Sequence, residues 1–354
     1  MKRTSKEFLT KLLSAPGPSG FEQPVQAVFR QYVTPYCDET LPDLHGNVAA
    51  VKKGMGGGHT IMLSGHCDEV GLMVVEADSD GYLYVAAIGG LLPWLLPGLK
   101  LDIHTARGVV KGVVGSKPVH LVPQAERDKP ISGMDKLWVD IGARSRDEAL
   151  EAVSLGDPAT YGAGVEMLRN NRLCSKSCDD RVGVFVVAEA LRLLAKDRLA
   201  SDVAAVSSVQ EEVGLRGATT AAYNVHPDIG IAVDVTQCSD VPGVDSKSIG
   251  RAVMGGGPVV ARGANINPRV FEVMMKAAQE EGIAVQVRGA PRGTGTDANA
   301  IQLSRGGVAT GLVSIPNRYM HTPVEVVSLD DLEGAARLVA AFVRLADRTE
   351  SFLP

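Results

Sequence analysis

The sequence predicts an α/β protein into which a small β-rich segment is inserted. The chain has 354 residues, which is long for one compact domain. From residue 182 onward, strand-like and helix-like patterns alternate, as they do when helices cover the faces of a sheet. Between residues 71 and 162, short β-type runs dominate instead. We therefore expect a larger domain made of residues 1–70 and 163–354, interrupted by a β-rich domain at 71–162.

The first seventy residues contain two expected helices and two expected strands. Apolar residues at helical spacing predict a helix at 6–14, and the Pro- and Gly-rich run at 15–20 ends it. A second helix is expected at 23–32. Strands are expected at 47–52 and 60–64, and the second of these leads into His66.

The rest of the chain divides into the β-rich part and the alternating part. In the β-rich part, turn residues separate expected strands at 71–75, 82–87, 100–105, 108–114 and 136–141. In the alternating part, helices are expected at 182–194, 268–281 and 329–345, and strands at 203–209, 229–235, 283–288 and 310–314. This alternation of helices and strands is typical of a sheet with helices on its faces.

Charge and composition exclude several classes of partner. The net charge is −5 and no basic run is present, so nucleic acid is not an expected partner. The most apolar run, at 91–97, is too short to span a bilayer and contains two prolines, so no membrane association is expected. No secretory signal is recognisable, and the five scattered cysteines are typical of free thiols in a reducing cytoplasm.

Glu211 and Glu212 are the most informative pair of residues. Two adjacent carboxylates raise each other's pKa, and neighbouring side chains on an extended backbone point in opposite directions. The pair therefore suits a division of labour, with one carboxylate for a cation and the other for a proton. A solvated acidic turn is the alternative, but an apolar strand precedes the pair and Val213-Gly214-Leu215 follows it.

Four further places carry residues with the same chemistry. His66 and Asp68 lie two apart after a strand, so Asp68 can accept a hydrogen bond from the ring, although a structural histidine is an alternative. Asp179 and Asp180 precede a helix, and capping accounts for one of them. The remaining two places are Asp234, inside an apolar strand, and His321, in a loop.

Nearly all of these residues follow strands of one expected sheet. Open α/β sheets bind ligands at the carboxyl ends of their strands. Two histidines and at least three carboxylates suit a dinuclear site of nitrogen and oxygen ligands, for zinc or cobalt more than for copper or iron.

With these residues in place, the chain resembles the dinuclear-metal aminopeptidases of the tetrahedral (TET) type. That family includes glutamyl aminopeptidases and members that carry an endoglucanase label. The segments that match, in family order and over nearly the whole chain, are Pro16-Gly17-Pro18-Ser19-Gly20, Gly65-His66-Cys67-Asp68-Glu69-Val70-Gly71, Gly115-Ser116-Lys117-Pro118, Asp140-Ile141-Gly142-Ala143, Asp179-Asp180-Arg181-Val182-Gly183, Gln210-Glu211-Glu212-Val213-Gly214-Leu215-Arg216-Gly217-Ala218, Val233-Asp234-Val235-Thr236, Gly295-Thr296-Asp297-Ala298 and Ser314-Ile315-Pro316-Asn317-Arg318-Tyr319-Met320-His321-Thr322-Pro323.

The resemblance implies a role for each candidate residue. Asp179 would bridge two divalent metal ions, zinc or cobalt. His66 and Asp234 would complete the protein ligands of one ion, and Glu212 and His321 those of the other. Glu211 would be the general base for the hydrolysis of short peptides, and Asp68 would support His66.

The resemblance also implies an architecture and an assembly. The catalytic domain would have the mixed sheet of a zinc peptidase. The insertion, PDZ-like or barrel-like, would be a dimerisation domain whose dimers build a hollow dodecamer.

Three other functions remain open at this point. A dinuclear carboxypeptidase or deacylase of a related family would use the same ligands, but its smaller domain is usually inserted late, whereas here it follows His66 almost at once. Glycan hydrolysis would need two carboxylates and no metal ligands. A non-enzymatic family member would have no reason to keep the complete ligand set.

Overall fold

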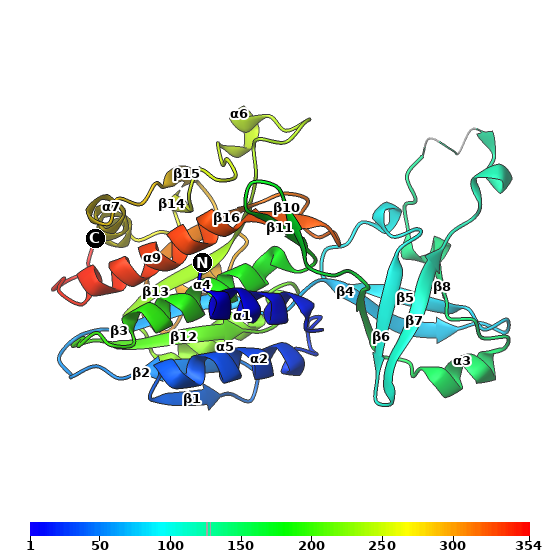
Figure 1. Ribbon diagram of the computed structural model, residues 1–354, viewed down its shortest axis with the longest axis horizontal. Coiled ribbons are helices and arrows are strands. Elements are labelled where there is room, and N and C mark those ends of the chain that lie inside the picture. Colours follow the sequence, from blue (N-terminus) through cyan, green and yellow to red (C-terminus); the bar gives the residue numbers. More distant parts are fainter. Residues whose placement is uncertain (125–126, 128) are drawn as a thin grey trace.

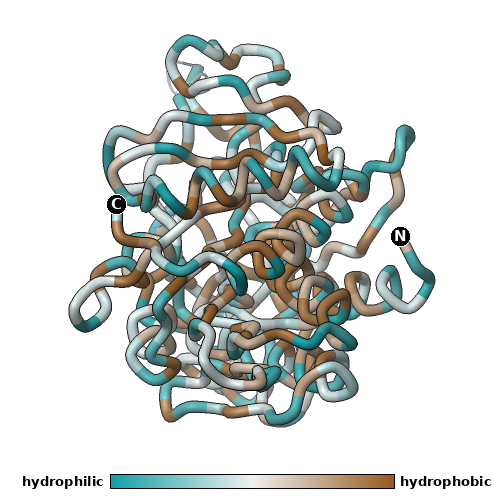
Figure 2. The backbone as a smooth tube through the Cα atoms, turned by 90° about the vertical axis from the view of Figure 1, so that its left-hand side faces the viewer, coloured by the Kyte–Doolittle hydropathy of each residue, from teal (hydrophilic) through white to brown (hydrophobic). Residues whose placement is uncertain are grey.

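The structure is a computed structural model that describes residues 1–124, 127 and 129–354. It consists of a large α/β part and a small β-barrel, which lies at one end of the molecule (Figure 1). The hydrophobic segments gather inside the α/β part (Figure 2). Within the described part of the chain, no helix combines the length and the apolar character needed to cross a bilayer.

The α/β part is built on an eight-stranded sheet with the order β1-β2-β12-β3-β13-β16-β14-β15. Its central strands β12, β3, β13 and β16 are parallel, so their carboxyl ends meet at one edge. Strands β2 and β14 run antiparallel to their inner neighbours, which makes the sheet mixed. The strands are β1 (Glu39–Pro42), β2 (Val48–Lys52), β3 (Thr60–His66), β12 (Asp202–Ser208), β13 (Ile229–Gln237), β14 (Val259–Gly263), β15 (Gln286–Ala290) and β16 (Ala309–Asn317).

Helices cover both faces of this sheet and bury the apolar strands between them. On one face α4 packs on the central strands and against α1 and α9, and on the other α5 packs on β12 and against α8. The α-helices are α1 (Arg3–Ser14), α2 (Gln23–Val33), α3 (Arg146–Ala152), α4 (Cys178–Leu194), α5 (Arg216–Val225), α6 (Ser246–Ile249), α7 (Pro268–Glu280), α8 (Ala298–Ile301) and α9 (Leu329–Ala346). Short 3₁₀ turns lie at Thr34–Tyr36, Pro93–Leu95, Val119–Leu121 and Met134–Lys136.

The β-rich insertion is a closed antiparallel barrel of six strands with the order β4-β5-β8-β7-β6-β9. It surrounds a separate hydrophobic cluster, to which Leu72, Leu83, Leu101 and Val139 belong. Its strands are β4 (Gly71–Ala77), β5 (Leu83–Ile88), β6 (Lys100–Thr105), β7 (Gly108–Gly115), β8 (Trp138–Asp140) and β9 (Pro158–Tyr161). The closing strand β9 was not expected from the sequence, because it is short and begins with proline.

A buried ion cluster and a small sheet connect the elements that carry the site. Glu69, just after β3, accepts hydrogen bonds from Lys176 at 2.6 and 2.7 Å and from Arg181 at 2.8 Å, so it ties this loop to the start of α4. Burial alone would raise the pKa of Glu69, but Arg181 and Lys176 lower it to about 2.

The small antiparallel sheet, β10-β11-β17, consists of β10 (Glu166–Leu168), β11 (Arg172–Ser175) and β17 (Glu325–Ser328).

Candidate metal centre

The candidate residues meet at the carboxyl edge of the parallel strands. His66 is the last residue of β3, Asp234 lies near the end of β13, and His321 follows β16. A cavity of about 530 Å³ opens at this edge. Its lining includes six of the seven residues to which the resemblance assigns a role, namely His66, Asp179, Glu211, Glu212, Asp234 and His321. Asp68 is the seventh and is fully buried beneath them.

Asp179 lies between the two histidines. Its Oδ1 is 3.1 Å from His66 Nε2, and its Oδ2 is 3.4 Å from His321 Nε2. Each carboxylate oxygen therefore faces a different imidazole. A carboxylate in this position has the geometry needed to join two ions, each held by one histidine.

The neighbouring Asp180 makes hydrogen bonds to the backbone instead. Its Oδ1 accepts a hydrogen bond from the Gly183 N–H at 3.1 Å, and its Oδ2 accepts one from the His66 N–H at 3.2 Å. The first contact satisfies a backbone donor in the first turn of α4. Capping thus accounts for Asp180, which leaves Asp179 free to face the cavity; the peptide bond between them is cis.

Glu211 and Glu212 lie in a turn, so the expectation of an extended backbone at this pair is wrong. Strand β12 ends at Ser208, Gln210 has a φ of 54°, and the N–H of Gly214 bonds back to the Glu211 carbonyl at 2.9 Å. The two side chains still face different histidines. Glu211 Oε2 is 3.8 Å from His66 Nε2, whereas Glu212 Oε1 is 3.3 Å from His321 Nε2.

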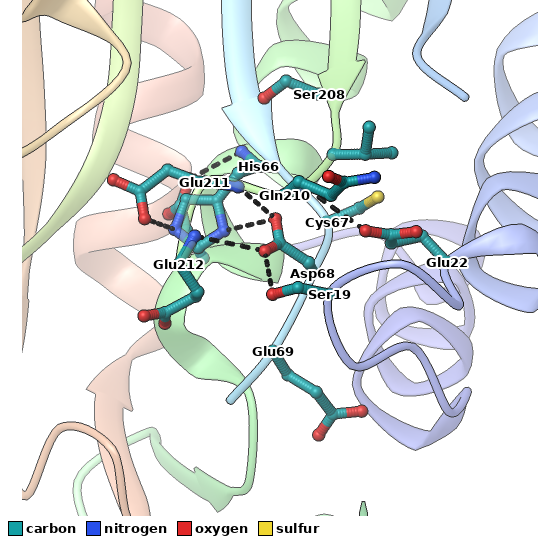
Figure 3. Close-up of polar contacts among 12 residues, drawn as sticks. Ser19, Glu22, His66, Cys67, Asp68, Glu69, Ser208, Gln210, Glu211 and Glu212 are labelled. Carbon is teal, nitrogen blue, oxygen red and sulfur yellow. Dashed lines mark hydrogen bonds and ion pairs between the residues drawn. The ribbon is translucent and has the colours of Figure 1, made fainter. Parts of the chain in front are cut away.

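Asp68 holds the turn that presents the glutamate pair. Its two oxygens accept the backbone N–H groups of Glu211 at 3.0 Å and Glu212 at 3.2 Å, and the Ser19 hydroxyl donates at 2.7 Å (Figure 3). His66 Nδ1 lies 3.3 Å from Asp68 Oδ1, but without the alignment of a hydrogen bond. Asp68 therefore lies against His66 without accepting the expected hydrogen bond from its ring, and it also holds the backbone of both glutamates.

The crowding of carboxylates among the candidate residues favours a bound cation at this site. His66, Glu211 and Asp234 offer ligand atoms within 4.8 Å of one another, and so do His66, Asp179 and Glu212. Burial raises the pKa of Glu211 to about 9 and that of Asp234 well above its usual value. Crowded buried carboxylates cannot all ionise without a compensating charge, and a divalent ion supplies one.

Two residues that matter here were not singled out from the sequence. Glu325 Oε2 accepts the Asp179 N–H at 2.8 Å, and its Oε1 accepts the His321 N–H at 3.0 Å, so one carboxylate positions two candidate ligands. A signal was available, because Glu325 stands in the apolar run Val324-Glu325-Val326-Val327, as Asp234 stands in its strand. Asp297 is also buried and accepts the hydroxyls of Ser64 at 2.9 Å and Ser208 at 2.6 Å.

The loop that follows strand β5 of the barrel reaches the centre. The Gly90 carbonyl, just after β5, lies 2.7 Å from His321 Nδ1 and accepts its proton, which leaves Nε2 to face Asp179 and Glu212. A Cβ at Gly90 would lie only 3.2 Å from that ring nitrogen. The approach of barrel and imidazole therefore leaves little room for a side chain at this position.

The comparison with known proteins agrees with this fold. The profile of the M42 glutamyl aminopeptidase family matches residues 46–338. The lysyl aminopeptidase of Pyrococcus furiosus is 38% identical over 339 residues, which is 95% of this chain and 96% of that protein. The crystal structure of a TET aminopeptidase from a marine sediment archaeon, Thaumarchaeota archaeon SCGC AB-539-E09, superposes with a TM-score of 0.90 at 36% identity and covers 96% of each chain.

A further solved structure bears on assembly. The TET1 peptidase of Pyrococcus horikoshii is 31% identical to this chain, with a TM-score of 0.83 over 95% of this chain and 98% of that one. That protein can assemble into a tetrahedron or a large octahedral shell.

The fold and the site thus define a peptide hydrolase. More narrowly, the chain belongs to the M42 glutamyl aminopeptidase family, and it is an aminopeptidase. The family resemblance found in the sequence and the predicted α/β fold with a β-rich insertion are confirmed.

Proposed function

We propose that this aminopeptidase removes single residues from the N-termini of short peptides with two divalent metal ions, zinc or cobalt. The placement of Asp179 between His66 and His321 carries this proposal. Asp179 would offer one carboxylate oxygen to each ion. His66 and Asp234 would complete the protein ligands of the first ion, and Glu212 and His321 would complete those of the second. The 3.3 Å distance from Glu212 to His321 supports the second pair.

In the proposed hydrolysis the two adjacent glutamates have different roles. Bound divalent ions would polarise the scissile carbonyl and lower the pKa of the attacking water. Glu211 takes the proton from that water and later gives it to the leaving amine. The position of Glu211 beside the candidate ligands His66 and Asp234, at the wall of the cavity, supports this role.

The experiment that tests this function compares a tripeptide with its N-acetylated form, using protein loaded with zinc or cobalt. We expect hydrolysis of the free-amine peptide only, and we expect a chelator to abolish it and added metal to restore it. Equal hydrolysis of the acetylated peptide would favour a carboxypeptidase or deacylase. Hydrolysis of glycans that survives the chelator would favour a glycosidase.

Gly90 provides a test of the second metal position. In Gly90→Ala the added methyl presses on the His321 ring, so we expect the ion held by His321 to bind about 10–100-fold more weakly. Titration of metal-free protein with zinc would show one site weakened and one retained. Gly306→Ala is the matched control, because a Cβ there meets no atom within 4 Å. Unchanged affinity at both sites in Gly90→Ala would contradict the assignment.

For the assembly we propose that residues 71–162 form a separate dimerisation domain, and that dimers build a dodecamer. The barrel has its own hydrophobic cluster, and Val109 and Val113 are 52% and 47% exposed on one side of β7. Light scattering should report a dodecamer for the intact protein and smaller species for Val109→Glu/Val113→Glu. A monomeric intact protein would refute the proposal.

A further inference from the structure

The segment between helices α1 and α2, residues 15–22, lies against the two loops that carry much of the candidate site. At the loop after β3, the Gly17 N–H donates a hydrogen bond to Glu69 Oε1 at 3.1 Å, and the Gly17 carbonyl accepts the Glu69 N–H at 3.0 Å. At the turn after β12, the side chain of Glu22 joins the segment to Gln210. The α1–α2 segment therefore connects these two loops through hydrogen bonds.

Glu22 is a buried carboxylate just before α2 and is only 4% exposed. Its Oε1 accepts the Gly20 N–H at 2.7 Å and the Gln210 N–H at 3.2 Å (Figure 3). The backbone of Gln210 has a φ of 54°, a left-handed conformation that is unfavourable for glutamine. Such a conformation persists where its surroundings hold it, so the bond to Glu22 stabilises the start of this turn.

Three successive backbone N–H groups of the turn donate to buried carboxylates. Gln210 donates to Glu22, and the two glutamates that follow it donate to Asp68. Asp68 also accepts the hydroxyl of Ser19 at 2.7 Å, and Ser19 belongs to the α1–α2 segment. The segment thus supports the turn directly through Glu22 and indirectly through Ser19 (Figure 3).

This support comes from outside the cavity. Neither Glu22 nor Ser19 is among the described residues that line the cavity, whereas Glu211 is. A general base must lie within hydrogen-bond reach of the water from which it takes a proton, and a displacement of about 1 Å can cost about 10²-fold in rate. A residue that fixes the backbone next to Glu211 can therefore affect turnover without touching the substrate.

We propose that Glu22 is a positioning residue for the general base Glu211. By accepting the Gln210 N–H, it fixes the preceding peptide unit and keeps the Glu211 side chain within reach of the attacking water. This inference rests on the proposed aminopeptidase reaction and adds to it a residue that lies outside the cavity.

The experiment compares kcat and KM of Glu22→Met and Glu22→Gln on an aminoacyl anilide after loading with zinc or cobalt. Both replacements are unbranched and uncharged, but only the glutamine amide offers an oxygen that can accept the Gln210 N–H. Burial raises the pKa of Glu22 to about 7, so an uncharged side chain is already a natural state here near neutral pH. We expect Glu22→Met to lower kcat by about 10–100-fold with KM unchanged, and Glu22→Gln to restore most of the turnover.

Three further measurements test whether Glu22 acts through the turn. Added to Glu211→Gln, Glu22→Met should cause no further loss of kcat, because the base that it positions is already absent. Zinc titration of Glu22→Met should give wild-type affinities, because Asp68 still holds the N–H of the metal-ligand candidate Glu212. In metal-free protein, amide exchange over residues 209–214 should be about 3- to 10-fold faster in Glu22→Met than in the wild type or in Glu22→Gln.

Asp331→Ala is the matched control for the loss of a buried carboxylate. Asp331 is 1% exposed and accepts the N–H groups of Gly255 at 2.7 Å and Gly257 at 2.8 Å. None of these three residues is among the described residues that line the cavity. We expect this variant to lower the unfolding temperature as Glu22→Met does, but to keep the wild-type kcat.

The outcomes separate this inference from the function on which it rests. Wild-type kcat in Glu22→Met, an undiminished further loss in the Glu211→Gln background, or an equal loss of kcat in Asp331→Ala would show that Glu22 does not position the base, and the aminopeptidase function would stand. If the wild type hydrolyses no anilide at any metal loading, the proposed function is overturned and the positioning role with it.

Discussion

Replacement of Glu211 by glutamine is expected to lower kcat by about 10²–10⁴-fold while both metal ions stay bound. The amide keeps the size of the side chain but cannot take the proton from the attacking water. Asp68 accepts the backbone N–H of Glu211 rather than a side-chain atom, so the turn should keep its shape. Turnover of a good anilide substrate and metal content by mass spectrometry would be measured on the same preparation.

Glu272→Gln is the matched control for this substitution. Glu272 is exposed on α7 and pairs with Arg269, outside the cavity, so the control should retain wild-type turnover. Wild-type activity in Glu211→Gln would show that another group moves the proton. Loss of an ion from Glu211→Gln would instead indicate that Glu211 is a metal ligand. This is the main competing assignment, because Glu211 lies close to both His66 and Asp234.

Replacement of Asp179 by asparagine is expected to weaken the binding of both ions. An amide presents one oxygen and no charge, whereas the carboxylate of Asp179 faces His66 with Oδ1 and His321 with Oδ2. The loss of affinity should exceed the roughly 10–100-fold typical of a disturbed supporting residue, and turnover should fall with it. Zinc titration of the metal-free protein would measure both constants.

Asp180→Asn is the adjacent control for Asp179. Asp180 accepts hydrogen bonds from the N–H groups of His66 and Gly183, and an asparagine oxygen can still accept from one of them. This variant should retain more metal than Asp179→Asn. Two tightly bound ions in Asp179→Asn would contradict a bridging role.

The fold could be predicted from the sequence wherever a local pattern of apolar residues indicates a buried strand or helix. Strands β3, β12, β13 and β16 are apolar runs, and they lie where the sequence placed strands. Helix α5 was missed because its sequence, rich in alanine and threonine, buries only a narrow face made of Gly217, Ala218, Ala221 and Ala222. Strand β15 begins at Gln286 rather than near 283, since pairing with β14 determines its start.

The site was predictable to the extent that its residues follow strands or stand out chemically. His66, Asp234 and the glutamate pair could be found in this way, and the family resemblance separated Asp179 from Asp180. The contact of Gly90 could not be found, because this residue joins the site only through tertiary packing, from the loop after strand β5 of the barrel. Glu325 was overlooked although it shares with Asp234 the signal of a carboxylate in an apolar run.

The central claim is that the two adjacent glutamates do different work, and their glutamine variants test it most directly. Metal content and turnover should be measured side by side for Glu211→Gln and Glu212→Gln. The account predicts two bound ions and little turnover for Glu211→Gln, but a weakened ion at the His321 position for Glu212→Gln. Equal metal loss in both variants, or metal loss in Glu211→Gln alone, would contradict it.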